Sequence, residues 1–128
     1  MFTHVTVGAD DLDASRNFYD ATFAALGVAA GEVDFKGRVV YQSRFGRFLV
    51  TRPIDGGPAS HANGGTIGFA ADSPEAASAW HDAGMAHGGT SCEDPPGVRR
   101  LADGRELYLA YLRDPAGNKL CAVHRVQA

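Results

Sequence analysis

Two stretches of this 128-residue chain carry the same pattern, and this internal repeat limits the possible folds more than any other feature. Residues 4–28 align with residues 66–90 without a gap, at an offset of 62, and seven of the aligned positions are identical. Positions that differ keep their character, as where Phe18 aligns with Trp80. Such a repeat indicates two copies of one supersecondary unit, neither of which can bury its apolar face alone. We therefore expect two modules packed around a shared core.

Each copy begins with a short alternating strand and continues as a helix. Asp11 and Ser73 stand at equivalent positions before the helices, where a side-chain oxygen can accept from the first free N–H groups. Pro74 suits the first helical position, and glycines end both helices. Runs rich in β-branched and aromatic residues predict strands over 38–43, 47–51, 107–113 and 119–123, with a further short strand within 30–34 and within 88–92.

These elements predict an α+β fold of two tandem βαβββ modules in a single domain. The first module spans residues 1–53 and the second spans residues 66–128. Residues 54–65, rich in Gly, Ser, Asn and Pro, form the linker between them.

Composition and charge exclude several classes of function. Hydrophobic residues make up 45% of the chain and charged residues 21%, with a net charge of -3. No basic stripe suited to nucleic acid is present, and no apolar run approaches the roughly 20 residues of a membrane span. The first residues lack the pattern of a signal peptide, so we expect a cytoplasmic protein. Two cysteines, Cys92 and Cys121, are then expected to be free thiols.

Two segments resemble the vicinal oxygen chelate superfamily, which includes glyoxalase I, bleomycin-resistance proteins and dioxygenases. Residues 4–20, HVTVGADDLDASRNFYD, are similar to its opening strand and helix, and residues 111–123, YLRDPAGNKLCAV, to its closing D-P-x-G-N hairpin. The resemblance covers nearly the whole chain. It implies that the modules form a curled mixed sheet around a central cavity (the glyoxalase/bleomycin resistance fold), and that the protein is a homodimer, as family members commonly are.

The resemblance also indicates where a metal would be bound. Catalytic members hold a divalent ion through residues on the first and last strands of each half. The expected histidine falls on His4, its counterpart in the second half on Thr66, and the glutamate after the hairpin glycine on Cys121. The fourth position falls on Leu49 or Val50. One ligand is intact, so we expect no cofactor and a degenerate metal site; a Zn, Ni, Mn or Fe ion is the alternative.

Strand alternation places these residues independently of the resemblance. The valines of residues 5–7 point towards the helix, so His4 and Thr6 face the other side of the sheet. Leu120 likewise leaves Cys121 on that side, so these residues and Thr66 are expected to line one cavity. We expect Cys121 to lie within reach of His4.

Cys121 has three interpretations. The favoured one is a small buried apolar residue. A nucleophile activated by His4 is a second, although no third group to orient the pair is evident. A zinc site formed by His4, Cys121 and His61, from the linker, is a third.

Other candidate ligand-binding residues are aromatic or cationic. Arg99 lies in a predicted loop, where its guanidinium can meet an anionic substrate or remain solvated. Tyr108 and Tyr111 are three residues apart on one strand, so one lines the cavity and the other faces the helices. Aromatic walls with a few polar groups are typical of small-molecule pockets.

Three functions are compatible with these features. The favoured hypothesis is a metal-independent binder of a small molecule, of the bleomycin-resistance type. A metal-dependent glyoxalase-type lyase or isomerase, or a dioxygenase-like enzyme, is the alternative. A structural dimer with a vestigial cavity is the third. The sequence does not indicate which molecule is bound.

Overall fold

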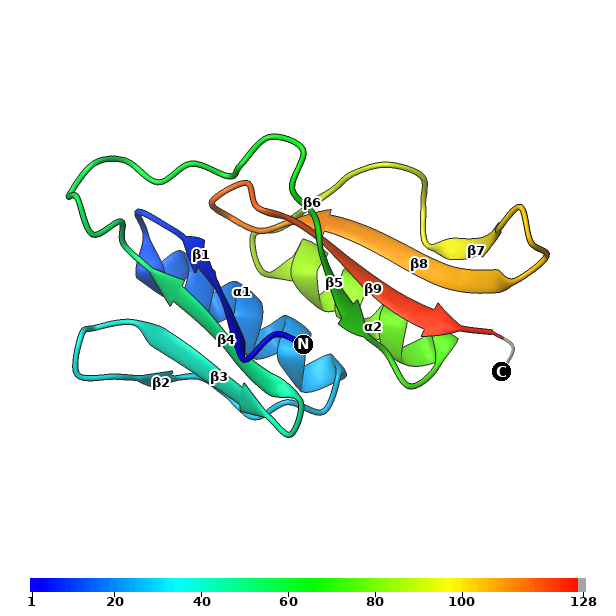
Figure 1. The fold of residues 1–128 in the computed structure, drawn as a ribbon, viewed down its shortest axis with the longest axis horizontal. Helices are drawn as coiled ribbons and strands as arrows, with labels where there is room; N and C mark the ends of the chain where they lie inside the picture. The colour runs from blue at the N-terminus through cyan, green and yellow to red at the C-terminus, as the bar shows by residue number, and fades with distance from the viewer. Residues whose placement is uncertain (127–128) are drawn as a thin grey trace.

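The computed structural model describes residues 1–126, which form two helices and nine strands (Figure 1). The first module consists of β1 (His4–Gly8), α1 (Leu12–Ala25), β2 (Glu32–Val33), β3 (Val39–Ser43) and β4 (Gly46–Thr51). The second consists of β5 (Ile67–Ala70), α2 (Pro74–Ala86), β6 (Thr90–Ser91), β7 (Gly97–Arg100), β8 (Glu106–Arg113) and β9 (Lys119–Arg125). The predicted second module runs to residue 128, and its last two residues lie outside the described part.

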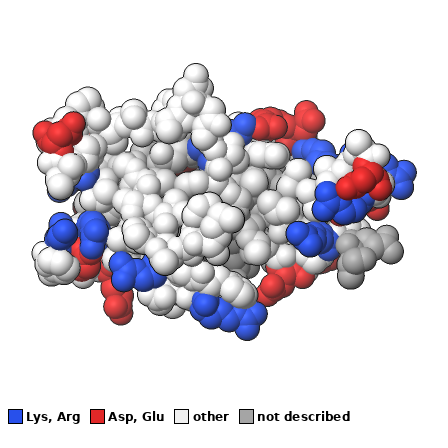
Figure 2. All heavy atoms as spheres, in the orientation of Figure 1, with Lys and Arg blue, Asp and Glu red and all other residues white. Residues whose placement is uncertain are grey.

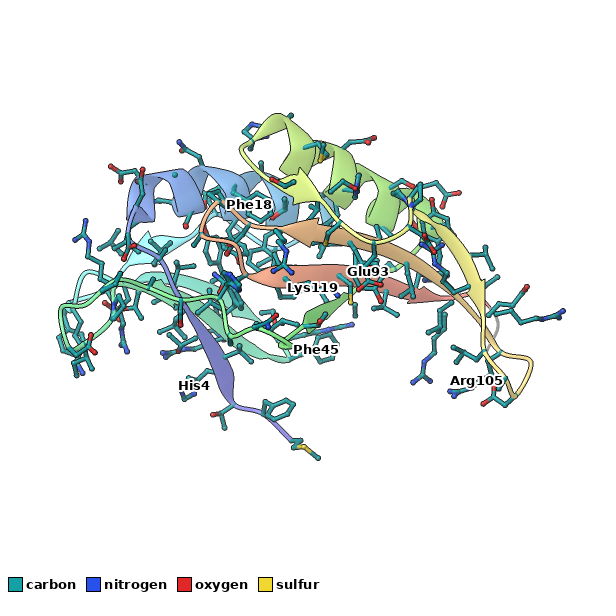
Figure 3. The ribbon with its side chains drawn as sticks, turned by 90° about the horizontal axis from the view of Figure 1, so that it is seen from above. His4, Phe18, Phe45, Glu93, Arg105 and Lys119 are labelled. Carbon is teal, nitrogen blue, oxygen red and sulfur yellow. The ribbon has the colours of Figure 1, made fainter. Side chains whose placement is uncertain are left out.

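Each module builds one mixed sheet, and the two sheets have the same topology. The first has the order β1-β4-β3-β2 and the second β5-β9-β8-β6. In the second sheet, β7 also pairs with the first half of β8, from Glu106 to Leu109. In both, the opening strand runs parallel to the last one. Figures 1 and 3 show the sheets side by side with both helices on one side of them. The predicted α+β fold is confirmed, and the sheets do not close into a barrel.

Local signals set the ends of both helices as predicted. The Asp11 carboxylate accepts a hydrogen bond from the Ala14 amide at 3.0 Å, and the Ser73 hydroxyl accepts one from the Ala76 amide at 3.0 Å. Gly27 follows the first helix at a φ of +80°, a conformation that glycine adopts without steric cost. The chain therefore turns back towards the sheet immediately after each helix.

One element was not predicted: the segment around Arg99 is a strand rather than a loop. β7 pairs antiparallel with β8, with Val98 opposite Tyr108 and Arg99 opposite Leu107. A tight turn joins the two strands, closed by a 2.8 Å hydrogen bond from the Leu101 amide to the Arg105 carbonyl. The prediction was wrong because the segment lacks strand composition, and pairing with the longer β8 decides its conformation.

The core lies between the sheets and the helices, and aromatic rings fill it. Phe23 of α1 contacts Phe69 of β5 edge to face at 5.0 Å between ring centroids, so the two modules share one core. Trp80 is fully buried, as predicted from its alignment with Phe18, which is also fully buried. The expected inward positions are buried (Val7) or packed against the core as partly buried residues (Val5, Ile67, Phe69).

The closing hairpin turn joins the two modules. Asp114, which begins this turn, accepts a 2.5 Å hydrogen bond from the hydroxyl of Tyr19 in α1, and both residues are buried. Asn118 donates to the Gly8 carbonyl of β1 at 3.1 Å and to Asp114 at 2.8 Å. These hydrogen bonds of the D-P-x-G-N turn hold the two modules together, and Asp114 and Asn118 are called the clasp here.

No helix within residues 1–126 is long and apolar enough to cross a membrane.

Candidate functional site

The side of the two sheets that faces away from α1 and α2 is called the open face here. Figure 2 shows this face: its middle is mostly uncharged, and charged side chains gather towards its rim. All the predicted site residues except Tyr108 come from strands or strand ends that border it. What the face can bind depends on which of these residues lie together.

Cys121 lies on the open face of the second sheet, as strand alternation predicted. Its register partners are Tyr111 on β8 and Gly68 on β5, so the three residues form a row across the sheet. A Cβ atom on Gly68 would lie 3.3 Å from the Cys121 sulfur, so the absence of a side chain at Gly68 lets the thiol pack closely against β5. Cys121 is 7% exposed, and burial raises the pKa of its thiol. The thiol therefore stays neutral at ordinary pH.

Two charged residues that the sequence analysis did not single out complete this group. Lys119, at the start of β9, forms an ion pair with Glu93 from the loop between β6 and β7 (Figure 3). The Lys119 nitrogen also lies 5.4 Å from the centroid of the Tyr111 ring, a cation–π distance. Alternation already placed Lys119 on the same side as Cys121, but no local pattern indicated that a distant loop would supply its carboxylate partner.

Arg99 belongs to the same group. It lies opposite Leu107, on the side of β8 that also carries Tyr111. Its guanidinium donates to the Pro95 carbonyl at 2.8 Å, and its charge lowers the pKa of Tyr111 against the larger raising effect of burial. The positive charges of Arg99 and Lys119 therefore both lower the pKa of Tyr111.

Of the two tyrosines, Tyr111 faces the open side and Tyr108 faces the helices. The Tyr108 hydroxyl lies 2.6 Å from the hydroxyl of Ser78 in α2. This corrects the inclusion of Tyr108 among the cavity residues: the hydrogen bond to α2 holds it in the helix layer.

His4 and Thr6, predicted on the first strand of the first half, lie apart from this group (Figure 3), whereas Thr66 immediately precedes β5, whose first two residues pair with Leu120 and Cys121. His4, Thr6 and Thr66 are all exposed. The Nδ1 atom of His4 lies 2.9 Å from the hydroxyl of its neighbour Thr3. Figure 3 shows His4 at the far end of β1, well separated from the Glu93–Lys119 pair beside Cys121. The expected proximity of His4 and Cys121 is not met, because β1 and β5 belong to separate sheets and the packing between modules sets the angle between them.

The residues of one chain do not fit the metal that the fold family implies. Within residues 1–126, no three side chains of His, Cys, Asp or Glu are placed to hold one ion. Leu49, one candidate for the fourth ligand position, is apolar and 1% exposed. His61 lies instead against the closing turn, where its ring would be 3.0 Å from a Cβ atom on Gly117. The zinc alternative of His4, Cys121 and His61 is therefore not assembled within a chain.

Both cysteines are free thiols. Cys92 follows β6, which pairs with β8 on the side away from β9. The strand that carries Tyr111 thus lies between the two cysteines, which places their backbones about 10 Å apart at the usual spacing of two strands. This distance is too large for a disulfide without backbone movement.

A hollow of about 640 Å³ lies elsewhere, between α1, the end of α2 and the closing turn. Asn17, Asp20, His87 and Pro115 are among the residues that line it. None of the predicted site residues does. It lies on the helix side of the molecule and is distinct from the open face.

Comparison with known proteins identifies the family. The model of the Glyoxalase/Bleomycin resistance protein/Dioxygenase superfamily matches residues 1–122. The chain belongs to this superfamily. No curated protein matches the sequence significantly.

Solved structures agree with this assignment. A glyoxalase/bleomycin resistance protein from Albidiferax ferrireducens is 56% identical, with a TM-score of 0.93 over 98% of this chain and 99% of that one. Lactoylglutathione lyase from Agrobacterium tumefaciens is 24% identical, with a TM-score of 0.64 over 97% and 92% of the two chains. A family enzyme from Burkholderia phytofirmans is 16% identical, with a TM-score of 0.73 over 97% and 98%. The last two share the fold alone, because one superfamily fold hosts many activities.

Proposed function

We propose that this protein binds a small organic molecule on the open face of its second sheet, without a metal ion. The observation that carries this proposal is the grouping of Tyr111, Lys119 and Arg99 around the buried thiol of Cys121. An aromatic ring, an apolar floor and a few cationic groups are typical of small-molecule sites.

The donor set favours binding over metal-dependent catalysis. A glyoxalase-type lyase or isomerase, or a dioxygenase-like enzyme, needs about three protein ligands and an open coordination position. In this chain His4 stands alone on β1, and no three side chains of His, Cys, Asp or Glu within residues 1–126 are placed to hold one ion.

NMR mapping of bound molecules tests this function. In a screen of small aromatic acids and neutral aromatics against ¹⁵N-labelled protein, hits should shift the amide signals of Gly68, Tyr111 and Cys121. Replacing Tyr111→Ala should weaken binding at least about tenfold, because the aromatic contact is lost. The matched variant Tyr108→Phe, on the helix side of the same strand, should bind normally. Shifts confined to the hollow beside Asn17, or unchanged affinity in Tyr111→Ala, would reject this assignment.

We also propose that the protein forms a homodimer through the first module. β1 and β5 each lie at one end of a sheet, so each has an edge with no strand partner within residues 1–126. Phe2 and Phe45 are 74% and 77% exposed and adjoin one another, since the Arg47 amide that follows Phe45 and Gly46 donates to the Thr3 carbonyl. A second copy covering this corner removes apolar surface from water and shields an open sheet edge.

Sedimentation measures the assembly directly. Wild-type protein at micromolar concentration should show twice the 13.5 kDa mass of one chain. Phe45→Glu should give monomers, because it places a charge in the interface. Phe35→Glu, at another exposed phenylalanine that lies on the turn before β3, should remain dimeric. A monomeric wild-type protein, or dimers in Phe45→Glu, would refute this assembly.

A further inference from the structure

Glu93 is held in an unusual backbone conformation beside the proposed site. Its φ is +56°, in the left-handed region that residues other than glycine seldom adopt. Such strain persists only where surrounding contacts enforce it, and it is concentrated at functional sites. The contact that Glu93 gains in this conformation is its ion pair with Lys119.

The Glu93 carboxylate therefore pairs with a lysine that itself lies over an aromatic ring. Lys119 contacts both the carboxylate and the Tyr111 ring, and its side chain is only 24% exposed. Figure 3 shows Glu93 and Lys119 directed towards one another from different elements, a loop and a strand. The loop can carry Glu93 away without disturbing the sheet, because Glu93 is outside both β6 and β7.

A second cation on the same side of β8 has no carboxylate partner, and its charge acts on Tyr111. Arg99 takes part in none of the ion pairs formed among the described residues. One of its guanidinium nitrogens donates to the Pro95 carbonyl, which leaves other N–H groups available. Around Tyr111 there are thus two positive side chains and one negative side chain.

We propose that the open-face site binds molecules bearing a carboxylate, and that Glu93 is a built-in competitor that fills the carboxylate position when no ligand is bound. This inference rests on the proposed binding function and names its ligand class. A ligand carboxylate replaces Glu93 at Lys119 and gains the fork of N–H donors on Arg99. The rest of the ligand lies against the Tyr111 ring. The ligand class is a carboxylate because the site already accommodates one.

Benzoate and benzamide make a suitable pair of probes, since they have the same shape and differ in charge. We expect dimeric wild-type protein to bind benzoate more tightly than benzamide, in titrations at low salt followed by ¹⁵N NMR. Glu93→Gln should bind benzoate about fivefold or more tighter than wild type, because the competitor is removed and the open site is fully populated. Lys119→Met should lose most benzoate affinity. Circular dichroism establishes that each variant is folded.

Asp103→Asn is the matched control. Asp103 pairs with Arg105 in the turn before β8, as another carboxylate near a basic residue, and lies away from Tyr111 in sequence and register. Its removal changes net charge as Glu93→Gln does, so benzoate affinity should stay at the wild-type value. An equal gain in Asp103→Asn would show that net charge alone acts, and would overturn the role of Glu93.

The remaining outcomes separate the two proposals. If benzamide and benzoate shift the Tyr111 and Cys121 signals equally, and Glu93→Gln changes neither affinity, the site binds small molecules but the carboxylate inference is wrong. If no aromatic compound of either charge shifts these signals in any folded variant, the proposed binding function fails and this inference fails with it.

Discussion

Cys121 occupies a position where the superfamily pattern places a glutamate, and its surroundings keep the thiol protonated. Burial raises its pKa most, and the negative charge of Glu93 raises it further, whereas Lys119 lowers it. A raised pKa means less thiolate at any given pH, so nucleophilic chemistry at Cys121 is disfavoured. The residue is a small buried group, as the favoured interpretation expects.

Alkylation kinetics test this account of the thiol. In a Cys92→Ser background, iodoacetamide should react slowly with Cys121 at pH 7 and faster as the pH rises through and beyond the ordinary thiol range, around 8.5. Glu93→Gln should speed the reaction at a given pH, because it removes a charge that raises the pKa. Lys119→Met should slow it. A rapid reaction at pH 7 that levels off below pH 8 would contradict this account.

At the scale of elements, the sequence predicted what local chemistry decides. The helix caps at Asp11 and Ser73, and the inward face of each long strand, depend on neighbouring residues and were correct. β7 was missed because its conformation depends on pairing with β8. The partnership of Glu93 and Lys119 was missed for the same reason, since a loop folding over a sheet leaves no periodic signal.

α2 contains a glycine that its packing requires. A Cβ atom on Gly84 would lie 2.3 Å from Leu112 of β8 and 3.0 Å from Phe18 of α1, so the glycine lets the helix approach both. Gly84→Ala should therefore lower the free energy of unfolding by about 1–3 kcal/mol through overpacking, even though alanine favours helices. Urea denaturation measures this change. Ala79→Gly, at an exposed position of α2, should lose up to about 1 kcal/mol from propensity alone. A Gly84→Ala protein more stable than wild type would show that the contact is not tight.

At the scale of the whole molecule, the angle between the modules decides which residues meet, and short-range patterns do not specify it. Alternation placed His4 and Cys121 on the same side of their sheets but could not place them at one point. The clasp at Asp114 and Asn118, bonded to Tyr19 and Gly8, fixes that relation within the chain.

Breaking the clasp should weaken the whole fold. Tyr19→Phe removes the hydrogen bond to the buried Asp114 carboxylate and should cost about 2 kcal/mol of unfolding free energy, the usual value for a bond to a charged group. Tyr108→Phe removes a less buried, neutral hydrogen bond and should cost about 1 kcal/mol. Equal losses in urea denaturation would indicate that the clasp has no special part in joining the modules.

The central claim is that this member of the superfamily keeps a binding face without a metal. Metal content of the purified protein, measured by mass spectrometry after incubation with Zn²⁺, Ni²⁺ or Mn²⁺ and removal of free ions, tests it most directly. The account predicts less than about 0.1 ion per chain, because one imidazole and one thiol are too few donors. One tightly held ion per chain, lost in His4→Ala and in Cys121→Ser, would contradict it and favour the metal-dependent enzyme.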